Sequence, residues 1–374
     1  MVHVAATLWS FREQSRQNQA SRIAQFCAKH GIMTRFSVLP RLRDKMQRLK
    51  DDMAFRRALR CRKGHGLTNA TPRDVTVIAL VRNGAFYLAP FLAHHRALGA
   101  AHFIFCDTGS TDDTLNRLME EPDVTILEAR LPIRFESAFR AHAAQTYCRG
   151  HWCLYADMDE RFTFEGAAQI GLPGLTAYLE RQGHTALMAQ MLEMFPTGPL
   201  SDYAHAPYDT AIAAFDHCDI TDVDWVEYED PQLPMAWFVR RNTVADPGLR
   251  FAFGGIRGKV FGEGCCLTKH PLVFVDGLTE PGIHPHCAGH VRCADFSALL
   301  QHYKFTNDPF GRDAATVAAS GIGHGEDEKR LSRADDALSL FSETAQRYSG
   351  LEPLYEAGFL VRSPLYSDFL ATQT

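Results

Sequence analysis

Two carboxylates, Asp157 and Asp159, directly follow the apolar run 152–156 in the segment WCLYADMDER. Their spacing lets both hold one divalent cation, and carboxylate oxygens suit hard ions such as Mg²⁺ or Mn²⁺. A metal ion held there can bridge the two phosphates of a nucleotide leaving group, which predicts transfer from an activated, phosphate-bearing donor. Any strand that ends in an acidic turn produces the same pattern, so the neighbouring elements decide its meaning.

Apolar, β-branched runs alternate with segments of helical spacing in the region before the acidic pair. This alternation predicts βαβ units and an α/β fold, with a mostly parallel sheet flanked by helices. The predicted strands are 75–81, 102–106, 124–127 and 152–156, and the predicted helices are 85–98, 110–119 and about 135–148. Ligands bind beyond the carboxyl ends of such strands, where Arg82, Asp107 and Asp157 fall.

Four motifs follow one another here in close order: VRN at 81–83, HHRALG at 94–99, DTGSTDDT at 107–114 and DMDE at 157–160. With them, residues 74–162 resemble the nucleotide-binding half of family 2 glycosyltransferases of the GT-A (Rossmann-like) fold, and a bacterial branch of that family in particular. A looser resemblance continues through FGGIRGKVFG, KHPLVF and HYKF, which begin at residues 253, 269 and 302.

The resemblance implies a nucleotide site at the first two strand ends. Asp107 takes the position that contacts the nucleotide base, although an Asx-type turn capping the following helix explains this residue equally well. Arg82 and Asn83 would lie beside the nucleotide, where a guanidinium can bind phosphate or stack on a base. Gly84 stands where the branch usually has Glu, so any role of that carboxylate is missing or supplied elsewhere.

The resemblance also implies that Mn²⁺ or Mg²⁺ binds at the acidic pair. Asp159 would bind the ion directly, and Asp157 would bind it directly, through water, or contact the donor sugar or ribose. Glu160 would anchor the loop. The family often supplies a further ligand from the C-terminal part of the chain, and His284 is the first candidate, with His286 the second.

The segment around these histidines, GIHPHCAGHVRC, has two other interpretations. Its imidazoles and thiols suit a structural zinc site, but their spacing matches no familiar zinc finger. Alternatively, the histidines form local hydrogen bonds in a polar loop. The side chains concerned are His284, His286, Cys287, His290 and Cys293.

Family 2 resemblance implies inversion at the anomeric carbon, which requires a carboxylate to accept the acceptor's proton. After Gly254-Gly255, where the family places this base, the sequence offers Glu263 and Asp276. The rival carboxylates are Glu193, Asp202, Glu227, Glu229 and Asp230. Arg257 is the preferred cation for the diphosphate because its fork recognises phosphate oxygens bidentately, with Lys259 and Lys269 as alternatives.

Composition is that of a globular chain: of 374 residues, 46% are hydrophobic and 22% are charged, enough for a large core. The ten cysteines follow no regular framework, so most are expected to be reduced core thiols. No run of about 18 apolar residues and no leader-like N-terminus is present, which predicts a cytoplasmic location.

Residues 1–63 hold 15 Lys+Arg against 4 Asp+Glu, whereas the rest holds 24 against 40. Such an arm can lie on its own acidic chain or a partner, or peripherally on the inner face of a membrane, which its apolar residues at helical spacing favour. No nucleic-acid module follows it, so nucleic acid is not an expected partner.

The predicted organisation has four parts. A basic, helical N-terminal extension covers 1–70, the nucleotide-sugar half covers 74–162, the acceptor half covers 163–310, and a C-terminal helical segment covers 311–374. Within the last part, 324–348 has the pattern of one charged amphipathic helix.

The sequence thus predicts a metal-dependent inverting glycosyltransferase that moves a sugar from a nucleotide sugar, expected to be a UDP-sugar, to a glycan or lipid-linked acceptor of a bacterial surface polysaccharide. Two alternatives stay open. A sugar nucleotidyltransferase usually has a Gly-rich loop after its first strand, where this chain has VRNGAFYLAP. A non-catalytic binding or scaffold protein could have kept the fold.

Overall fold

A computed structural model describes residues 50–318 and 325–373. The chain divides into two units, Met1–Ala54 and Phe55–Thr374. The predicted membrane-binding positions of the basic arm lie outside the described residues. No helix among the described residues is long and apolar enough to cross a membrane.

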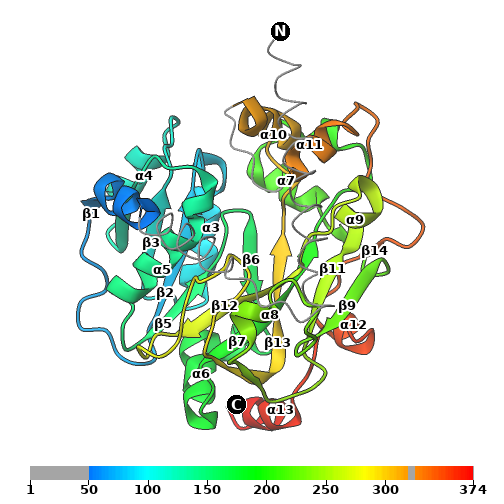
Figure 1. Cartoon of the computed structure of the whole chain (residues 1–374). Helices are drawn as coiled ribbons and strands as arrows, with labels where there is room; N and C mark the ends of the chain where they lie inside the picture. Colours follow the sequence, from blue (N-terminus) through cyan, green and yellow to red (C-terminus); the bar gives the residue numbers. More distant parts are fainter. Residues whose placement is uncertain (1–49, 319–324, 374) are drawn as a thin grey trace, which may run out of the picture. The chain divides into compact units, whose positions relative to one another are not determined.

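The second unit is built on a ten-stranded mixed sheet (Figure 1). Five of its strand pairings are parallel and four antiparallel, which confirms an α/β fold with a mostly parallel sheet. In spatial order the strands are β1 (Arg60–Lys63), β4 (Val124–Glu128), β3 (His102–Asp107), β2 (Val75–Val81), β5 (Trp152–Tyr155), β12 (Thr268–Phe274), β7 (Ala186–Glu193), β13 (Arg292–His302) and β10 (Thr243–Val244), and β6 (Glu160–Thr163) pairs with β13.

Helices cover both faces of the sheet because its central strands are apolar on both sides. On β2, Val77 joins a core with α3 (Ala85–Ala97), α6 (Ala167–Gln182) and α13 (Pro364–Ala371), while Ile78 joins an opposite core with α5 (Glu136–Tyr147). Consecutive strand residues therefore point to opposite layers.

A third core gathers the shorter elements beyond β7 and β13. The remaining helices and strands of the described residues are α4 (Thr114–Glu120), η2 (Ile133–Phe135), η3 (Leu200–Tyr203), α7 (Tyr208–Ala214), β8 (His217–Cys218), β9 (Val223–Glu227), α8 (Ala236–Val239), β11 (Arg250–Gly254), α9 (Gly255–Phe261), α10 (Pro309–Ala318), α11 (Glu326–Leu331), β14 (Gln346–Arg347) and α12 (Glu352–Glu356). In Figure 1, α10 and α11 lie beside α7, near the end of β13.

The predicted strands and helices of 75–156 are confirmed, with ends shifted by up to four residues. The single helix over 324–348 is wrong: α11 ends at Leu331, and Gln346–Arg347 pair with β8 instead. The predicted extension also contains β1, which is paired with β4 at the sheet edge.

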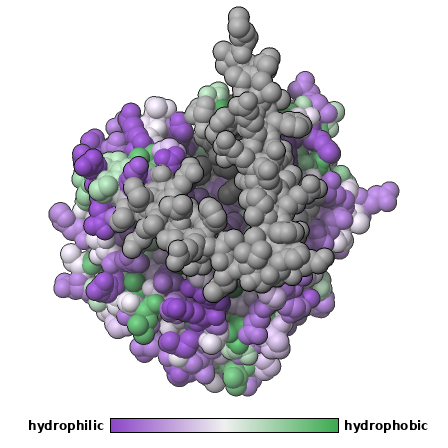
Figure 2. Space-filling model, in the orientation of Figure 1, coloured by the Kyte–Doolittle hydropathy of each residue, from purple (hydrophilic) through white to green (hydrophobic). Residues whose placement is uncertain are grey.

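The thiols follow the predicted pattern, and one face of the molecule can be seen in Figure 2. Figure 2 shows mostly hydrophilic residues, with hydrophobic ones in separate small areas. Of the nine cysteines described, eight are buried and none is in a disulfide, which confirms the prediction of reduced core thiols for that part of the chain.

Candidate active site

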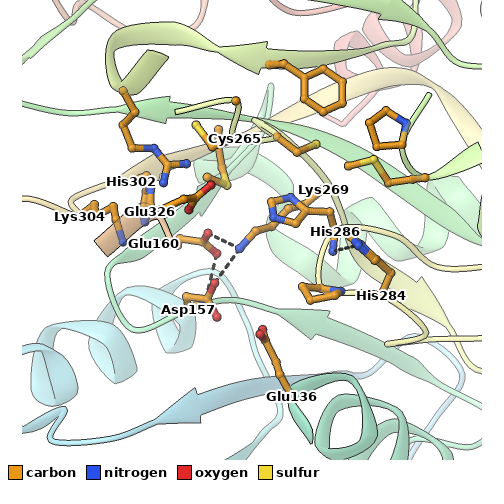
Figure 3. A pocket seen from close by; sticks show the side chains of 18 of the residues that line it. Glu136, Asp157, Glu160, Cys265, Lys269, His284, His286, His302, Lys304 and Glu326 are labelled. Atoms are coloured by element: carbon orange, nitrogen blue, oxygen red, sulfur yellow. Dashed lines mark hydrogen bonds and ion pairs between the residues drawn. The ribbon is translucent and has the colours of Figure 1, made fainter. Parts of the chain in front are cut away.

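A cavity of about 730 Å³ opens at one edge of the sheet. The carboxyl ends of β5, β7 and β13 meet there with the amino end of the antiparallel strand β12. Asp157 and Asp159 line the cavity from the turn after β5, Glu160 lines it from the start of β6, and Lys269 lines it from β12. Figure 3 shows Asp157, Glu160 and Lys269 pointing toward one another. Its volume lies within the range of small-ligand sites, about 300–1,000 Å³.

Asp157 is held by two cations. Its Oδ1 accepts from Arg140 Nη2 at 2.6 Å, and its Oδ2 accepts from Lys269 Nζ at 2.7 Å. Lys269 also donates to Glu160 Oε1 at 2.5 Å, as Figure 3 shows. Burial alone would raise the pKa of Asp157, but Lys269 and Arg140 hold it well below its ordinary value. Both oxygens of Asp157 are therefore occupied by side chains of the protein.

Asp159 has a different neighbour, the imidazole of His302. His302 Nε2 lies 3.6 Å from Asp159 Oδ1, while His302 Nδ1 lies 2.7 Å from Glu193 Oε1. Sheet register fixes the arrangement, because His302 on β13 is paired with Glu160 on β6 and with Glu193 on β7. Burial lowers the pKa of His302, but Glu193 and Asp159 together raise it to about 9.

A network of buried ion pairs continues from Glu193. Arg257 Nε lies 2.9 Å from Glu193 Oε1, and Arg257 Nη1 lies 3.4 Å from Glu263 Oε2. Arg330 of α11 completes the network by contacting Glu263 at 2.8 Å and Asp313 of α10 at 2.6 Å. Arg257, the predicted diphosphate cation, lines the cavity but is already engaged by two carboxylates.

Two charged side chains of the cavity wall differ from the rest. The side chains of Lys304 and Glu326 form no hydrogen bond or ion pair with the described residues, although both line the cavity. The Lys304 backbone oxygen accepts from Arg312 Nη2 at 2.6 Å. Burial and then the guanidinium groups of Arg330 and Arg257 lower the pKa of Lys304. Figure 3 shows Lys304 beside His302, and Glu326 near Cys265.

The predicted nucleotide site lies at the carboxyl ends of β2 and β3, and its residues Arg82, Asn83 and Asp107 do not line this cavity. Asp107 is fully buried, and its carboxylate accepts from the N–H groups of Gly109 and Ser110, so it forms the predicted Asx-type turn. Asn83 Oδ1 accepts from Thr111 N at 2.7 Å, and Arg82 is exposed. Contact of Asp107 with a base stays a prediction, and it would require opening this turn.

Gly84 has a steric reason to lack a side chain. A Cβ at this position would lie 2.5 Å from Val81 Cγ2 and 3.4 Å from Met158 Cε. The Gly84 N–H donates to Thr114 Oγ1 at 2.8 Å, which joins the end of β2 to the start of α4. A glutamate here would need a different packing of β2 against the turn that carries the acidic pair.

His284 lies in the same cavity but in different surroundings. Its Nδ1 accepts from the His286 backbone N–H at 3.1 Å, and its ring packs on Phe238. In Figure 3, His284 and His302 lie on opposite sides of Lys269. Over residues 50–318 and 325–373, no three His, Cys, Asp or Glu side chains are grouped to hold a metal. Neither the predicted ligands Asp157, Asp159 and His284 nor the side chains of the zinc alternative are therefore grouped around one point in the described residues.

The two predicted bases lie outside the cavity wall. Glu263 is 2% exposed and lies between Arg257 and Arg330. Asp276 Oδ1 accepts from the N–H groups of Leu278 and Thr279, so it shapes a turn.

Sequence reasoning missed His302, Lys304 and Glu326 as site residues. His302 and Lys304 could have been predicted, because the motif HYKF contains both. Glu326 had no signal, because it falls in the segment predicted as one surface helix.

No family model and no curated protein matches the chain. The resemblance to family 2 glycosyltransferases therefore stays a prediction from the motifs.

Proposed function

We propose that the protein is a metal-dependent inverting glycosyltransferase of the GT-A fold that uses a UDP-sugar. The observation that carries this proposal is Asp159 lying 3.6 Å from His302 inside a cavity of about 730 Å³ at the carboxyl ends of the strands. Strand order supports it, because β3 and β5 lie on opposite sides of β2. Ligands of open α/β sheets bind at such a reversal of strand order.

The donor set fits Mn²⁺ or Mg²⁺ at Asp159 better than at Asp157. Asp159 and His302 lie close enough to share one ion, which would take the place of the proton that His302 holds toward Asp159. Glu193 would then orient the imidazole in the manner of many metal-bound histidines. Asp157 would have to give up Arg140 and Lys269 to bind the ion directly. A bound ion would neutralise charge on the departing diphosphate.

Glu326 is the carboxylate that we assign to accept the proton of the attacking hydroxyl. It lines the cavity and is unpaired among the described residues, whereas Glu136 of the same wall is paired with Arg140 at 2.8 Å. A general base must reach the hydroxyl without being neutralised by a fixed cation. The acceptor, a glycan or lipid-linked glycan, would enter from this side.

Calorimetric titration with UDP and GDP, with Mn²⁺ or with EDTA, tests the proposal on the parent chain and on Asp159→Asn. We expect Mn²⁺-dependent binding of UDP that Asp159→Asn weakens at least tenfold. Asp276→Asn is the matched control, because Asp276 only shapes a turn. A panel of UDP-sugars then tests Glu326→Gln, which should retain UDP binding and lose about a hundredfold or more in transfer rate.

Failure of the folded parent chain to bind either nucleotide would refute the transferase assignment. It would leave the non-catalytic binding or scaffold alternative. Equal binding by the parent chain and Asp159→Asn would instead place the nucleotide elsewhere in the molecule.

A further inference from the structure

Among the described residues Lys304 has no counter-ion, in a cavity where Lys269 and Arg257 have theirs. Lys269 is held by Asp157 and Glu160, and Arg257 is held by Glu193 and Glu263. No carboxylate of the described residues lies within ion-pair distance of Lys304 Nζ, although Asp159 and Asp313 are near enough to act on it electrostatically. A partly buried ammonium left this way has lost part of its hydration without gaining a partner among the described residues.

The position of Lys304 indicates which kind of ligand it would bind. It comes two residues after His302, at the end of β13, and lies beside His302 in Figure 3. The guanidinium groups of Arg257 and Arg330 are close enough to repel it. An anion in the cavity would relieve that repulsion and pair with the ammonium, and oxygens of phosphate are a common partner of a lysine acting as a compact charge.

We propose that Lys304 is the residue that binds the phosphate groups of the ligand, the role predicted for Arg257. This inference rests on the proposed function for the identity of the ligand, but the phosphate site itself can be tested without a nucleotide. The negative charge of Asp159 attracts the Lys304 ammonium toward this wall of the cavity. A metal ion at Asp159 and the Lys304 ammonium would then contact the same diphosphate from neighbouring positions.

The test measures binding of inorganic pyrophosphate, UDP and uridine by calorimetry in the presence of Mn²⁺. Lys304→Met should weaken the binding of pyrophosphate and UDP about ten- to a hundredfold, as expected for loss of a charged hydrogen bond. The affinity for uridine should not change, because uridine has no phosphate group. Lys304→Arg should restore part of the affinity. Lys329→Met is the matched control, because Lys329 is an exposed lysine on α11 that donates to Gly262 O.

The outcomes separate this inference from the proposed function. Unchanged pyrophosphate and UDP binding by Lys304→Met would overturn the role of Lys304 and leave the transferase proposal standing. Pyrophosphate binding that depends on Lys304, without any UDP binding, would support the phosphate site and refute the nucleotide assignment. A parent chain that binds neither would refute both. Thermal unfolding checks each variant, and Lys304→Met should melt at or above the parent temperature because no ion pair is lost.

Discussion

The two aspartates of the acidic pair have different ionic partners, which indicates separate tasks, although their spacing suggests one shared task. Asp157 neutralises Arg140 and Lys269, whose side chains are only 2% and 7% exposed. Asp159 has His302 as its ionic partner and faces the cavity. Sequence spacing placed both carboxylates at the strand end but could not show which buried cations from α5 and β12 would reach them.

This division predicts that two isosteric substitutions change different properties, one the stability of the protein and the other its ligand binding. Asp157→Asn should lower the free energy of unfolding by about 2–3 kcal/mol, because two buried cations lose a partner, and the partial exposure of Asp157 keeps the cost below that of a fully buried pair. Asp159→Asn should cost less stability and instead weaken Mn²⁺-dependent UDP binding. Urea unfolding and calorimetry of both variants measure the two effects. Equal stability losses would show that the tasks are not divided in this way.

Elements near one another in sequence were predictable, and those that complete the site were not. The runs that became β2, β3, β4 and β5 are apolar enough to be identified locally. By contrast, β12 enters the sheet antiparallel between β5 and β7, and only that long-range pairing brings Lys269 to Asp157. His302 likewise reaches Asp159 through pairing of β13 with β6 and β7.

Helix α11 shows why periodicity misled in the C-terminal segment. The charged pattern of 324–348 is compatible with a long surface helix, yet Arg330 within it is 1% exposed and pairs with Glu263, Asp313 and Asp327. A helix anchored by a buried arginine cannot be a solvated charge stripe. The anchor instead fixes α11 against α10 and directs Glu326 toward the cavity.

Arg330→Met should therefore act on the element as well as on its own contacts. We expect a loss of about 3 kcal/mol or more in unfolding free energy, since Glu263 and Asp313 lose a buried partner. Amide hydrogen exchange should accelerate in α10 and α11 more than in β2 or β3. Arg333→Met is the control, because Arg333 is exposed and donates to Val260 O. Uniform acceleration over the whole unit would mean that Arg330 does not act locally.

Buried neutral histidines couple the stability of the whole molecule to pH. Burial lowers the pKa of His95 to about 3, helped by His94 and Arg161, and burial lowers the pKa of His270 to about 4. An unfolded histidine titrates near 6.5. Between these values the unfolded chain binds protons that the folded chain does not, so stability must fall as the pH drops below about 6.5.

The contribution of His95 can be isolated with His95→Leu. His95 Nδ1 lies 2.9 Å from Phe91 O, while its Nε2 is buried without a hydrogen-bond partner among the described residues, so leucine should cost little at pH 8. At pH 5 the parent chain should lose about 1–2 kcal/mol that the variant keeps, because protonation of one unfolded histidine no longer favours unfolding. Urea unfolding from pH 5 to pH 8 measures the difference, with His65→Leu as the exposed-histidine control. Parallel pH dependences in the parent chain and His95→Leu would place the acid sensitivity in other groups, such as the carboxylates of the ion-pair network.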